Sequence, residues 1–333
     1  MNQRSEEPVL RTADLVAGYQ VRRGLLGRRA EVAAVAGVNL TVREGETVCL
    51  VGESGCGKST LARSVVGLLR PRSGTVLVAG KDTAKLDRAG RLELRKNVQM
   101  VFQDPFASLN PRMTAGELIA EGWRVHPGLV AESDRQAEVA RLLAQVGLNP
   151  KHAGRYPHQF SGGQRQRISI ARALAVRPRL IICDEAVSAL DVSIQAQILA
   201  LLAQLQEELG IAYLFITHDL GVVRQIADRV AVMHLGQIVE TGTAEEIYQQ
   251  PRHPYTQALL SAAPSVDDWT DDYTEGIVLQ GDTPSPADPP SGCRFRTRCW
   301  LAEPRCATET PELAERGGPH LVACHFARPT VPT

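Results

Sequence analysis

The most informative stretch of the chain is a glycine-rich turn that follows the apolar run Val48–Val51. It reads Gly52-Glu53-Ser54-Gly55-Cys56-Gly57-Lys58-Ser59-Thr60. Three glycines allow the backbone to curl so that its amides face a polyphosphate, while the lysine reaches the outer phosphates and the serine hydroxyl binds Mg²⁺. A helix predicted from about Lys58 points its positive end at the same anion. The spacing therefore predicts a site for a nucleoside triphosphate and Mg²⁺.

A pair of carboxylates follows a second apolar run. Leu180–Cys183 is typical of a buried parallel strand, and Asp184 and Glu185 come directly after it. Parallel strands deliver such residues to the carboxyl edge of the sheet, where ligands bind. Because consecutive strand residues point to opposite sides, we expect one acid to hold Mg²⁺ and the other to orient or deprotonate an attacking water.

A second possible anion-binding segment lies far from the first. Ser161-Gly162-Gly163-Gln164 precedes the helical stretch Ile168–Val176, and Ser161 is a predicted N-cap. Two glycines at a helix start permit close approach of an anion. One chain cannot readily wrap both segments around one triphosphate, so we expect a dimer in which this segment covers the neighbour's nucleotide. A capped helix with a flexible entry is the alternative interpretation.

Hydrophobic patterns predict the elements that position these residues. Short apolar runs predict strands within 9–50 and at 74–80, 97–103, 180–183, 212–216 and 229–233, and helical periodicity dominates 104–175 and 195–209. Strands that alternate with helices favour an α/β fold with a largely parallel sheet. After about Glu246 the sequence becomes rich in Pro, Gly and Asp, and Pro284–Pro290 is predicted to be irregular. We therefore predict domains at 1–245, with a helical subdomain at about 104–175, and at 246–333.

Composition excludes some classes of protein. The 333 residues carry 37 basic and 37 acidic side chains, which argues against a polybasic nucleic-acid binder. No apolar run approaches the roughly 18 to 20 residues of a membrane span. The polar start, Met1–Pro8, does not resemble a signal peptide, so we expect a cytoplasmic protein. Cys49, Cys56 and Cys183 are expected to be reduced thiols.

Four further cysteines crowd into the last part of the chain. Cys293, Cys299, Cys306 and Cys324 are separated by five, six and seventeen residues. The surrounding sequence is poor in apolar residues, so a cross-link would be physically useful. A reducing compartment favours metal ligation over disulfides, and four thiolates suit Zn²⁺ or an iron–sulfur cluster. The spacing does not choose between these, and His320 or His325 could replace a thiolate around zinc.

The order of these motifs resembles that of ABC-type ATPases over roughly residues 9 to 245. The resemblance implies an α/β P-loop NTPase (RecA-like) core with a mostly parallel sheet, an antiparallel β-subdomain, an inserted helical signature subdomain and a Cys-rich C-terminal extension. It also implies roles in binding MgATP: Tyr19 stacks on adenine, Lys58, Ser59 and Thr60 hold the phosphates and the metal, and Asp184 binds Mg²⁺. For hydrolysis it implies that Gln103 senses the metal and the attacking water, that Glu185 is the general base, and that His218 holds the γ-phosphate and the water.

The same resemblance implies a head-to-tail dimer. Ser161, Gly162, Gly163 and Gln164 would contact the γ-phosphate bound to the partner subunit, and Asp191, which ends Ser188-Ala189-Leu190-Asp191, would lie at the dimer seam. Closure on ATP and reopening after hydrolysis would convert chemical energy into rigid-body motion.

A narrower likeness concerns four segments. Residues 52–58, 101–112, 191–197 and 253–256 resemble the ATPase subunits of bacterial oligopeptide and dipeptide importers. Cys56 and Asn110-Pro111-Arg112 are similar to the second of two ATPase types in that group, which implies a heterodimer with a paralogous ATPase. The likeness further implies two membrane permease subunits, contacted near Gln103–Arg112, an extracellular solute-binding protein, and a location on the cytoplasmic face of the membrane.

The likeness also bears on the cysteines and on the solute. Peptide-importer ATPases with such a tail carry a [4Fe-4S] cluster, so we expect that cluster on the four cysteines, with Zn²⁺ as the alternative. The expected function is ATP-driven peptide import, without nucleic acid. An importer of nickel or another small solute, a soluble ABC ATPase that acts on nucleic acid or ribosomes, and a non-catalytic scaffold are the alternatives.

Overall fold

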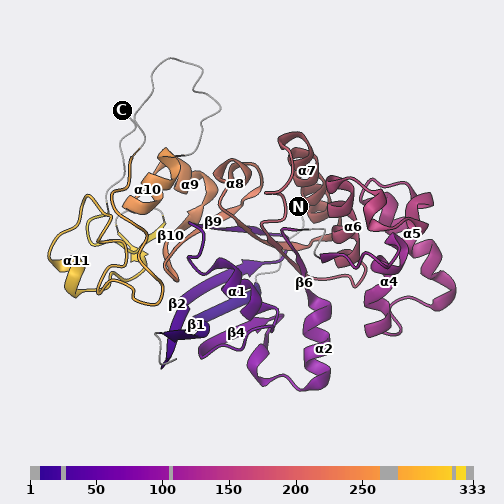
Figure 1. The fold of residues 1–333 in the computed structure, drawn as a ribbon, viewed down its shortest axis with the longest axis horizontal. Helices are drawn as coiled ribbons and strands as arrows, with labels where there is room; N and C mark the ends of the chain where they lie inside the picture. The colour runs from indigo at the N-terminus through magenta and orange to yellow at the C-terminus, as the bar shows by residue number, and fades with distance from the viewer. Residues whose placement is uncertain (1–7, 24–27, 105–107, 263–276, 317–319, 328–333) are drawn as a thin grey trace, which may run out of the picture. The chain divides into compact units, whose positions relative to one another are not determined.

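The structure is a computed structural model that describes residues 8–23, 28–104, 108–262, 277–316 and 320–327 (Figure 1). Nearly all of Met1–Pro8, and residues 105–107 within Gln103–Arg112, lie outside the described residues. The chain divides into two compact units. The first unit comprises 1–11, 41–46 and 77–216, and the second comprises 12–40, 47–76 and 217–333.

The first unit contains three parallel strands. They are β6 (Val98–Val101), β7 (Leu180–Asp184) and β8 (Ala212–Thr217), whose last residue belongs to the second unit. Val101 pairs with Cys183, and Asp184 pairs with Ile216. Leu180–Cys183 and all of β8 are buried, as their uninterrupted apolar sequence predicts for strands covered on both faces. The parallel arrangement expected from the sequence is confirmed here.

Helices make up most of the rest of the first unit. They are α2 (Arg88–Asn97), α4 (Ala115–Val125), α5 (Arg135–Gln145), α6 (Gly162–Leu174) and α7 (Val192–Leu209). Helices α4, α5 and α6 lie together in Figure 1. Buried Trp123 of α4 donates a 2.8 Å hydrogen bond to the carbonyl of Ala175, just past α6. The helical content predicted for residues 104–175 is therefore confirmed, and the predicted stop at Gly147 follows α5 with a left-handed φ of +73°.

The second unit begins with long strands. β1 (Pro8–Arg23), most of which belongs to this unit, lies between β2 (Arg28–Arg43) and β4 (Ser73–Val78). In the first unit, Leu77 and Val78 of β4 pair antiparallel with β5 (Lys81–Asp82). Thr12 ties β1 to β2, because its hydroxyl donates to Val38 O at 3.0 Å and accepts from Leu40 N at 2.9 Å.

The second unit also holds the strand that leads to the glycine-rich turn. β3 (Thr47–Val51) is buried throughout and pairs in parallel with β9 (Arg229–His234). β9 pairs antiparallel with β10 (Gln237–Thr243), and β10 pairs antiparallel with β12 (Leu321–Val322), which also pairs with β11 (Ala314–Glu315). The helices are α1 (Lys58–Val65), α8 (Leu220–Ile226), α9 (Ala244–Gln249), α10 (Pro254–Ser261) and α11 (Arg305–Thr308).

The C-terminal extension is attached through β10 and α10. Buried Glu240 of β10 accepts hydrogen bonds from Arg252 N at 2.7 Å and His253 N at 3.1 Å, and its carboxylate lies 2.7 Å from His320 Nε2. Residues 277–304 contain no helix or strand, as predicted for Pro284–Pro290, whereas α10 was not foreseen. Within the described residues, no helix is long and apolar enough to cross a membrane.

Candidate nucleotide-binding site

The glycine-rich turn has the backbone that its sequence predicts. Gly52, Gly55 and Gly57 have φ values of 154°, 80° and 113°, a range that side-chain-bearing residues rarely adopt. A Cβ at Gly52 would lie 2.1 Å from Met233 O, and one at Gly57 would lie 2.0 Å from Ala34 O. Glycine is therefore required at both positions by close backbone packing. At Gly55 nothing lies within 4 Å of such a Cβ, which leaves that part of the turn open.

Lys58 opens helix α1 at the predicted position. Its side chain is buried, and Nζ donates to Gly52 O at 2.6 Å and to Glu53 O at 3.0 Å. The ammonium thus lies inside the curl of the turn. Ser59 and Thr60 follow in the first turn of α1, half-buried and buried respectively. Turn amides, a buried cation and a helix N-terminus form a donor set that fits a triphosphate, and the Ser59 hydroxyl is a donor type suited to Mg²⁺.

Cys56 is part of this turn, and Tyr19 contacts helix α1, which follows it; both residues belong to the second unit. Cys56 is buried, burial raises the pKa of its thiol, and its carbonyl accepts a 2.7 Å bond from Gly236 N. Tyr19 is 37% exposed, and its hydroxyl lies 3.3 Å from Arg63 Nη1 of α1. Its ring is therefore accessible near α1, and its predicted stacking on adenine stays a prediction.

In the first unit, the acid pair lies at the carboxyl end of β7. Asp184 is the last strand residue, and Glu185 already has a left-handed φ of 49° while its amide donates to Ile216 O at 2.9 Å. The expected alternation of two strand residues is wrong for Glu185, because the strand ends before it. A non-glycine residue held at positive φ stores backbone strain, which occurs often at functional sites.

Gln103 lies beside the loop that carries these acids. It follows β6, is exposed, and its Nε2 lies 3.4 Å from Ser188 Oγ, which in turn donates to Glu185 O at 3.0 Å. Because β6 and β7 are parallel neighbours, their carboxyl ends bring Gln103, Asp184 and Glu185 to one edge. The structure therefore unites three of the predicted residues. Ser188, which links them, was not among the predicted site residues.

Helix α6 begins at the predicted N-cap. Ser161 Oγ accepts from Gln164 N at 3.3 Å, and Gln164 Oε1 accepts from Ser161 N at 3.1 Å, which forms a capping box. The two glycines differ in their surroundings. A Cβ at Gly163 would lie 2.4 Å from Ile194 Cγ2 of α7, whereas one at Gly162 would make only an ordinary 3.6 Å contact with Leu190. Packing explains Gly163, and nothing in the chain itself requires Gly162.

Two further predicted site residues, Asp191 and His218, lie in the loops that precede helices α7 and α8. Exposed Asp191 is the N-cap of α7, where it accepts from Ile194 N at 3.0 Å and from Ser193 Oγ at 2.8 Å. These bonds, that of the Ile194 amide first, lower the pKa of its carboxyl. His218 is exposed directly after β8 and precedes Asp219, the N-cap of α8. It belongs to the second unit, as the glycine-rich turn does.

The structure corrects the prediction of a metal site on the four C-terminal cysteines. They are free thiols, and in the part of the chain that the structure describes no group of three or more His, Cys, Asp or Glu side chains is arranged to hold a metal ion. Burial, reinforced by the neighbouring cysteines, raises the pKa of Cys299 to about 12 and that of Cys324 to about 11. His320 Nε2 and His325 Nε2 contact Glu240 and Glu309 O instead. The expected [4Fe-4S] cluster, and its zinc alternative, are therefore wrong.

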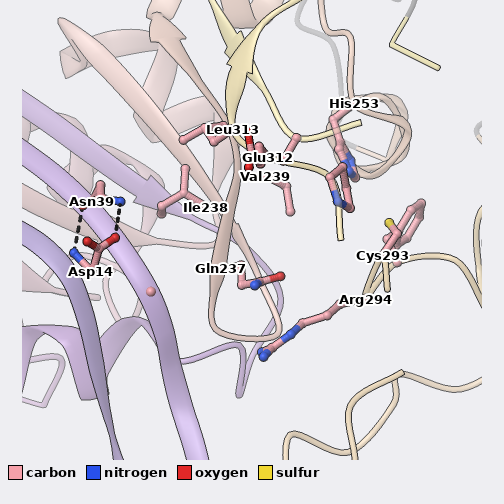
Figure 2. Close-up of a pocket in the computed structure, with 14 residues that line it drawn as sticks. Asp14, Asn39, Gln237, Ile238, Val239, His253, Cys293, Arg294, Glu312 and Leu313 are labelled. Carbon is pink, nitrogen blue, oxygen red and sulfur yellow. Dashed lines mark hydrogen bonds between the residues drawn. The ribbon is translucent and has the colours of Figure 1, made fainter. Parts of the chain in front are cut away.

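A pocket of about 390 Å³ in the second unit is separate from the glycine-rich turn (Figure 2). Asp14 and Asn39, which are hydrogen-bonded to each other, lie on one side, and Cys293 and His253 lie on the other. Arg294 reaches from the extension and donates to Leu235 O in the turn between β9 and β10. No residue of the turn at 52–60 lines this pocket, so it is not the predicted nucleotide site.

Comparison with solved structures supports the fold. The structure of cbiO1 from Clostridium perfringens, part of the ABC transporter complex cbiONQ, matches 73% of this chain and 91% of its own with a TM-score of 0.63 at 30% identity. The ATP-binding cassette MJ0796, a dimeric structure bound to ADP and Pi, matches 71% and 98% with a TM-score of 0.61 at 30% identity. Residues 35–188 match the family described as "ABC transporter". Fold and phosphate-binding turn thus define an ABC-type ATPase that uses ATP and Mg²⁺.

Comparison with known sequences is more specific. Residues 239–306 match the family described as "Oligopeptide/dipeptide transporter, C-terminal region". The oligopeptide transport ATP-binding protein AppF of Bacillus subtilis is 51% identical over 98% of this chain and 99% of its own length. OppF of Salmonella typhimurium is 50% identical over 95% of each chain, and the di/tripeptide transport protein DppF of Pseudomonas aeruginosa is 48% identical over 96% and 98%. The chain belongs to the family of oligopeptide transport ATP-binding proteins.

The expected heterodimer is also corrected. The relatives bear the names of single ATP-binding proteins, and none of these names gives a paralogous second ATPase. The expectation depended on Cys56 and Asn110–Arg112, and Cys56 is buried, with contacts to Lys58 and Gly236. A buried side chain of that kind reports local packing rather than the identity of a partner.

Sequence reasoning missed three residues that contact the glycine-rich turn. Tyr255 Oη accepts from Glu53 N at 2.8 Å, Thr283 Oγ1 lies 3.2 Å from Glu53 Oε2, and Arg298 Nη1 binds both Glu53 carboxylate oxygens. The His253–Thr256 segment gave a family signal for Tyr255 but no role. Nothing in the sequence pairs positions 53 and 298, which are 245 residues apart.

Proposed function

We propose that the chain is the ATP-hydrolysing subunit of an ABC importer of oligopeptides or dipeptides. The observation that carries this proposal is the match of its C-terminal region, residues 239–306, to the oligopeptide/dipeptide transporter family, together with near-complete coverage of AppF and OppF. It works peripherally at the cytoplasmic face of the membrane, with permease subunits that span the membrane and a solute-binding protein that delivers the peptide.

The proposed hydrolytic residues are Glu185, Gln103 and His218. The left-handed backbone of Glu185 fixes the direction in which its side chain leaves the backbone. The side-chain amide of Gln103 contacts Ser188, and Ser188 donates to the Glu185 carbonyl, so Gln103 is connected to the same loop. Glu185 accepts a proton from the attacking water, Gln103 orients that water, and His218 holds its geometry. Bound MgATP supplies the γ-phosphoryl group that is transferred to water.

The proposed binding residues come from four segments of one chain. Tyr19 stacks on the base, and residues 52–60 surround the phosphates with amides, with the Lys58 ammonium among them. Ser59 and Asp184 supply oxygens for Mg²⁺, and Gln103 senses the same metal ion. The buried position of Lys58 supports this assignment, because a buried ammonium is stabilised by an anion that enters the turn.

We further propose a head-to-tail dimer of ATP-binding subunits. Residues 161–164 and Asp191 would face the nucleotide of the partner. Support comes from exposed Ser161, from Gly162, whose missing side chain has no packing role, and from the dimer described for MJ0796. The domain limits proposed with it are 1–245, including the helical signature subdomain at about 104–175, and 246–333 for the Cys-rich extension.

The test is transport by the reconstituted system. The chain is co-expressed with candidate permease subunits, and the complex is placed in vesicles with a candidate solute-binding protein. Di- or oligopeptides should stimulate ATP hydrolysis and enter the vesicles, and Lys58→Ala should abolish both. Stimulation by nickel or by another small solute, and not by any peptide, would overturn the peptide assignment.

A further inference from the structure

The side chain of Glu53, the second residue of the phosphate-binding turn, is held by the C-terminal extension. Arg298 Nη1 lies 3.0 Å from Oε1 and 2.9 Å from Oε2 of Glu53, and Thr283 Oγ1 lies 3.2 Å from Oε2. The ion pair is largely shielded from water, because the Arg298 side chain is 10% exposed and that of Glu53 is 27% exposed. Two separate segments of the extension therefore converge on one carboxylate.

The backbone of Glu53 connects these contacts to Lys58. The Glu53 amide donates to Tyr255 Oη at 2.8 Å, and the Glu53 carbonyl accepts from Lys58 Nζ at 3.0 Å. The Glu53 amide lies in the same peptide plane as the Gly52 carbonyl, which accepts from Lys58 Nζ at 2.6 Å, so the bond to Tyr255 fixes that carbonyl as well. A group that moves Glu53 thus also moves the two carbonyls that position the ammonium.

The turn of the extension that carries Arg298 is itself anchored in the core. Arg298 N donates to Phe295 O at 3.0 Å, and Phe295 is 1% exposed. The Phe295 ring lies 5.4 Å from the Tyr255 ring and 5.3 Å from the His234 ring, distances typical of packed aromatic pairs. One short turn therefore packs against Tyr255 and presents Arg298 to Glu53.

A second route from the extension reaches the other end of the phosphate-binding turn. Arg294 donates to Leu235 O, and the next residue, Gly236, donates its amide to Cys56 O at 2.7 Å (Figure 2 shows Arg294). Arg294 and Arg298 thus act on the turn at Cys56 and at Glu53. A small hollow of about 170 Å³, lined by residues 53–56 and 283–286, lies between the two segments.

We propose that the C-terminal extension sets the nucleotide affinity of this chain, with Arg298 and Tyr255 as positioning residues that hold Glu53, and through it the Lys58 ammonium, in the geometry that binds triphosphate. The inference rests on the proposed nucleotide site. It assigns to the extension an effect on ATP binding, in addition to any contribution to stability.

The test measures ATP binding by the full-length chain, with a fluorescent ATP analogue and Mg²⁺. Arg298→Ala should raise Kd roughly 5- to 20-fold, the range expected when a shielded charged hydrogen bond is lost. Arg298→Lys should recover part of that loss, because it restores the charge. Tyr255→Phe keeps the ring packing and removes only the hydroxyl, and it should raise Kd as well even if Arg298→Ala fails to fold.

Two controls separate a positioning role from a structural one. Arg305→Ala removes an exposed ion pair with Glu309 inside the extension and should leave Kd unchanged. A double-mutant cycle of Glu53→Gln and Arg298→Ala should show non-additive changes in Kd. Folded Arg298→Ala and Tyr255→Phe variants that bind ATP within about twofold of the parent would overturn the inference, since effects on stability alone leave Kd unchanged.

Lys58→Ala distinguishes failure of this inference from failure of the proposed site. If Lys58→Ala abolishes binding while Arg298→Ala and Tyr255→Phe do not change it, only the role of the extension is refuted. If Lys58→Ala binds the analogue as tightly as the parent, the nucleotide site itself is wrongly assigned and the inference falls with it.

Discussion

At the scale of single residues, the chemistry depends on how the backbone holds Glu185. Its left-handed φ of 49° and its amide bond to Ile216 O fix the start of the side chain just beyond β7. Asp184, one residue earlier, is still in the strand. This break in conformation, and not strand alternation, separates the metal ligand from the base in the proposed mechanism.

Glu185→Gln should therefore lose hydrolysis and retain ATP binding. Removal of a general base costs roughly a hundredfold to ten-thousandfold in rate, whereas the amide keeps the size and the hydrogen bonds of the loop. Phosphate release and nucleotide binding are measured on the same preparation. Glu138→Gln, which removes the carboxylate that pairs with Arg141, is the matched control and should hydrolyse ATP normally. Parental turnover by Glu185→Gln would show that another group is the base.

At the scale of elements, helix α6 begins with two adjacent glycines: packing requires one of them, and the other has a proposed role in binding the partner's nucleotide. The capping box of Ser161 and Gln164 ends the loop and begins the helix, as the sequence predicts. Gly163 packs against Ile194 of α7, and this contact could not be read from the sequence, because it joins two helices. The sequence alone assigned both glycines to anion binding.

The two glycines should respond differently to alanine. Gly163→Ala forces a Cβ to within 2.4 Å of Ile194 Cγ2 and should destabilise the chain by about 1–3 kcal/mol in urea unfolding. Gly162→Ala meets only an ordinary contact and should leave stability unchanged or slightly raised. It should nevertheless reduce the ATPase rate of the dimer by about tenfold, the effect of one lost hydrogen bond. Unimpaired hydrolysis by Gly162→Ala would argue against a role opposite the partner's nucleotide.

At the scale of the whole molecule, stability should depend on pH through two buried histidines. Burial lowers the pKa of His234 to about 4, and burial with the nearby His234 lowers that of His253 to about 3. Both are neutral in the folded chain near neutral pH. Below about pH 6.5 the unfolded chain takes up protons that the folded chain does not, so stability is lost as pH falls.

The expected loss is roughly 1.4 kcal/mol per histidine for each pH unit below 6.5 until the folded pKa is approached. Burial is the main cause of the low pKa of His234; the Glu53 carboxylate opposes it, and the charges of Arg298 and Arg294 act in the same direction as burial. Urea unfolding at pH 7.5 and pH 5.5 measures the difference. His234→Phe should reduce the pH dependence, whereas His158→Gln, at an exposed ring stacked on Tyr156, should not. Equal midpoints at both pH values would contradict the prediction.

The sequence by itself determined the local chemistry. Spacing alone identified the turn at 52–60, the acids after β7, and the cap of α6, because each depends on residues within a few positions of one another. The parallel strands were also predictable, since burial on both faces requires uninterrupted apolar runs. The order of these motifs carried the resemblance to ABC-type ATPases, and residues 101–112, 191–197 and 253–256 carried the narrower resemblance to peptide importers.

Only the tertiary structure decided what depends on distant residues. It brought Gln103 to Ser188, packed Gly163 on Ile194, and paired Glu53 with Arg298. It also overturned the metal site in the described residues, because cysteine spacing does not fix whether four thiols are arranged as ligands require. The physical reason is that side-chain contacts across a fold, and the burial that shifts a pKa, are properties of packing and not of spacing along the chain.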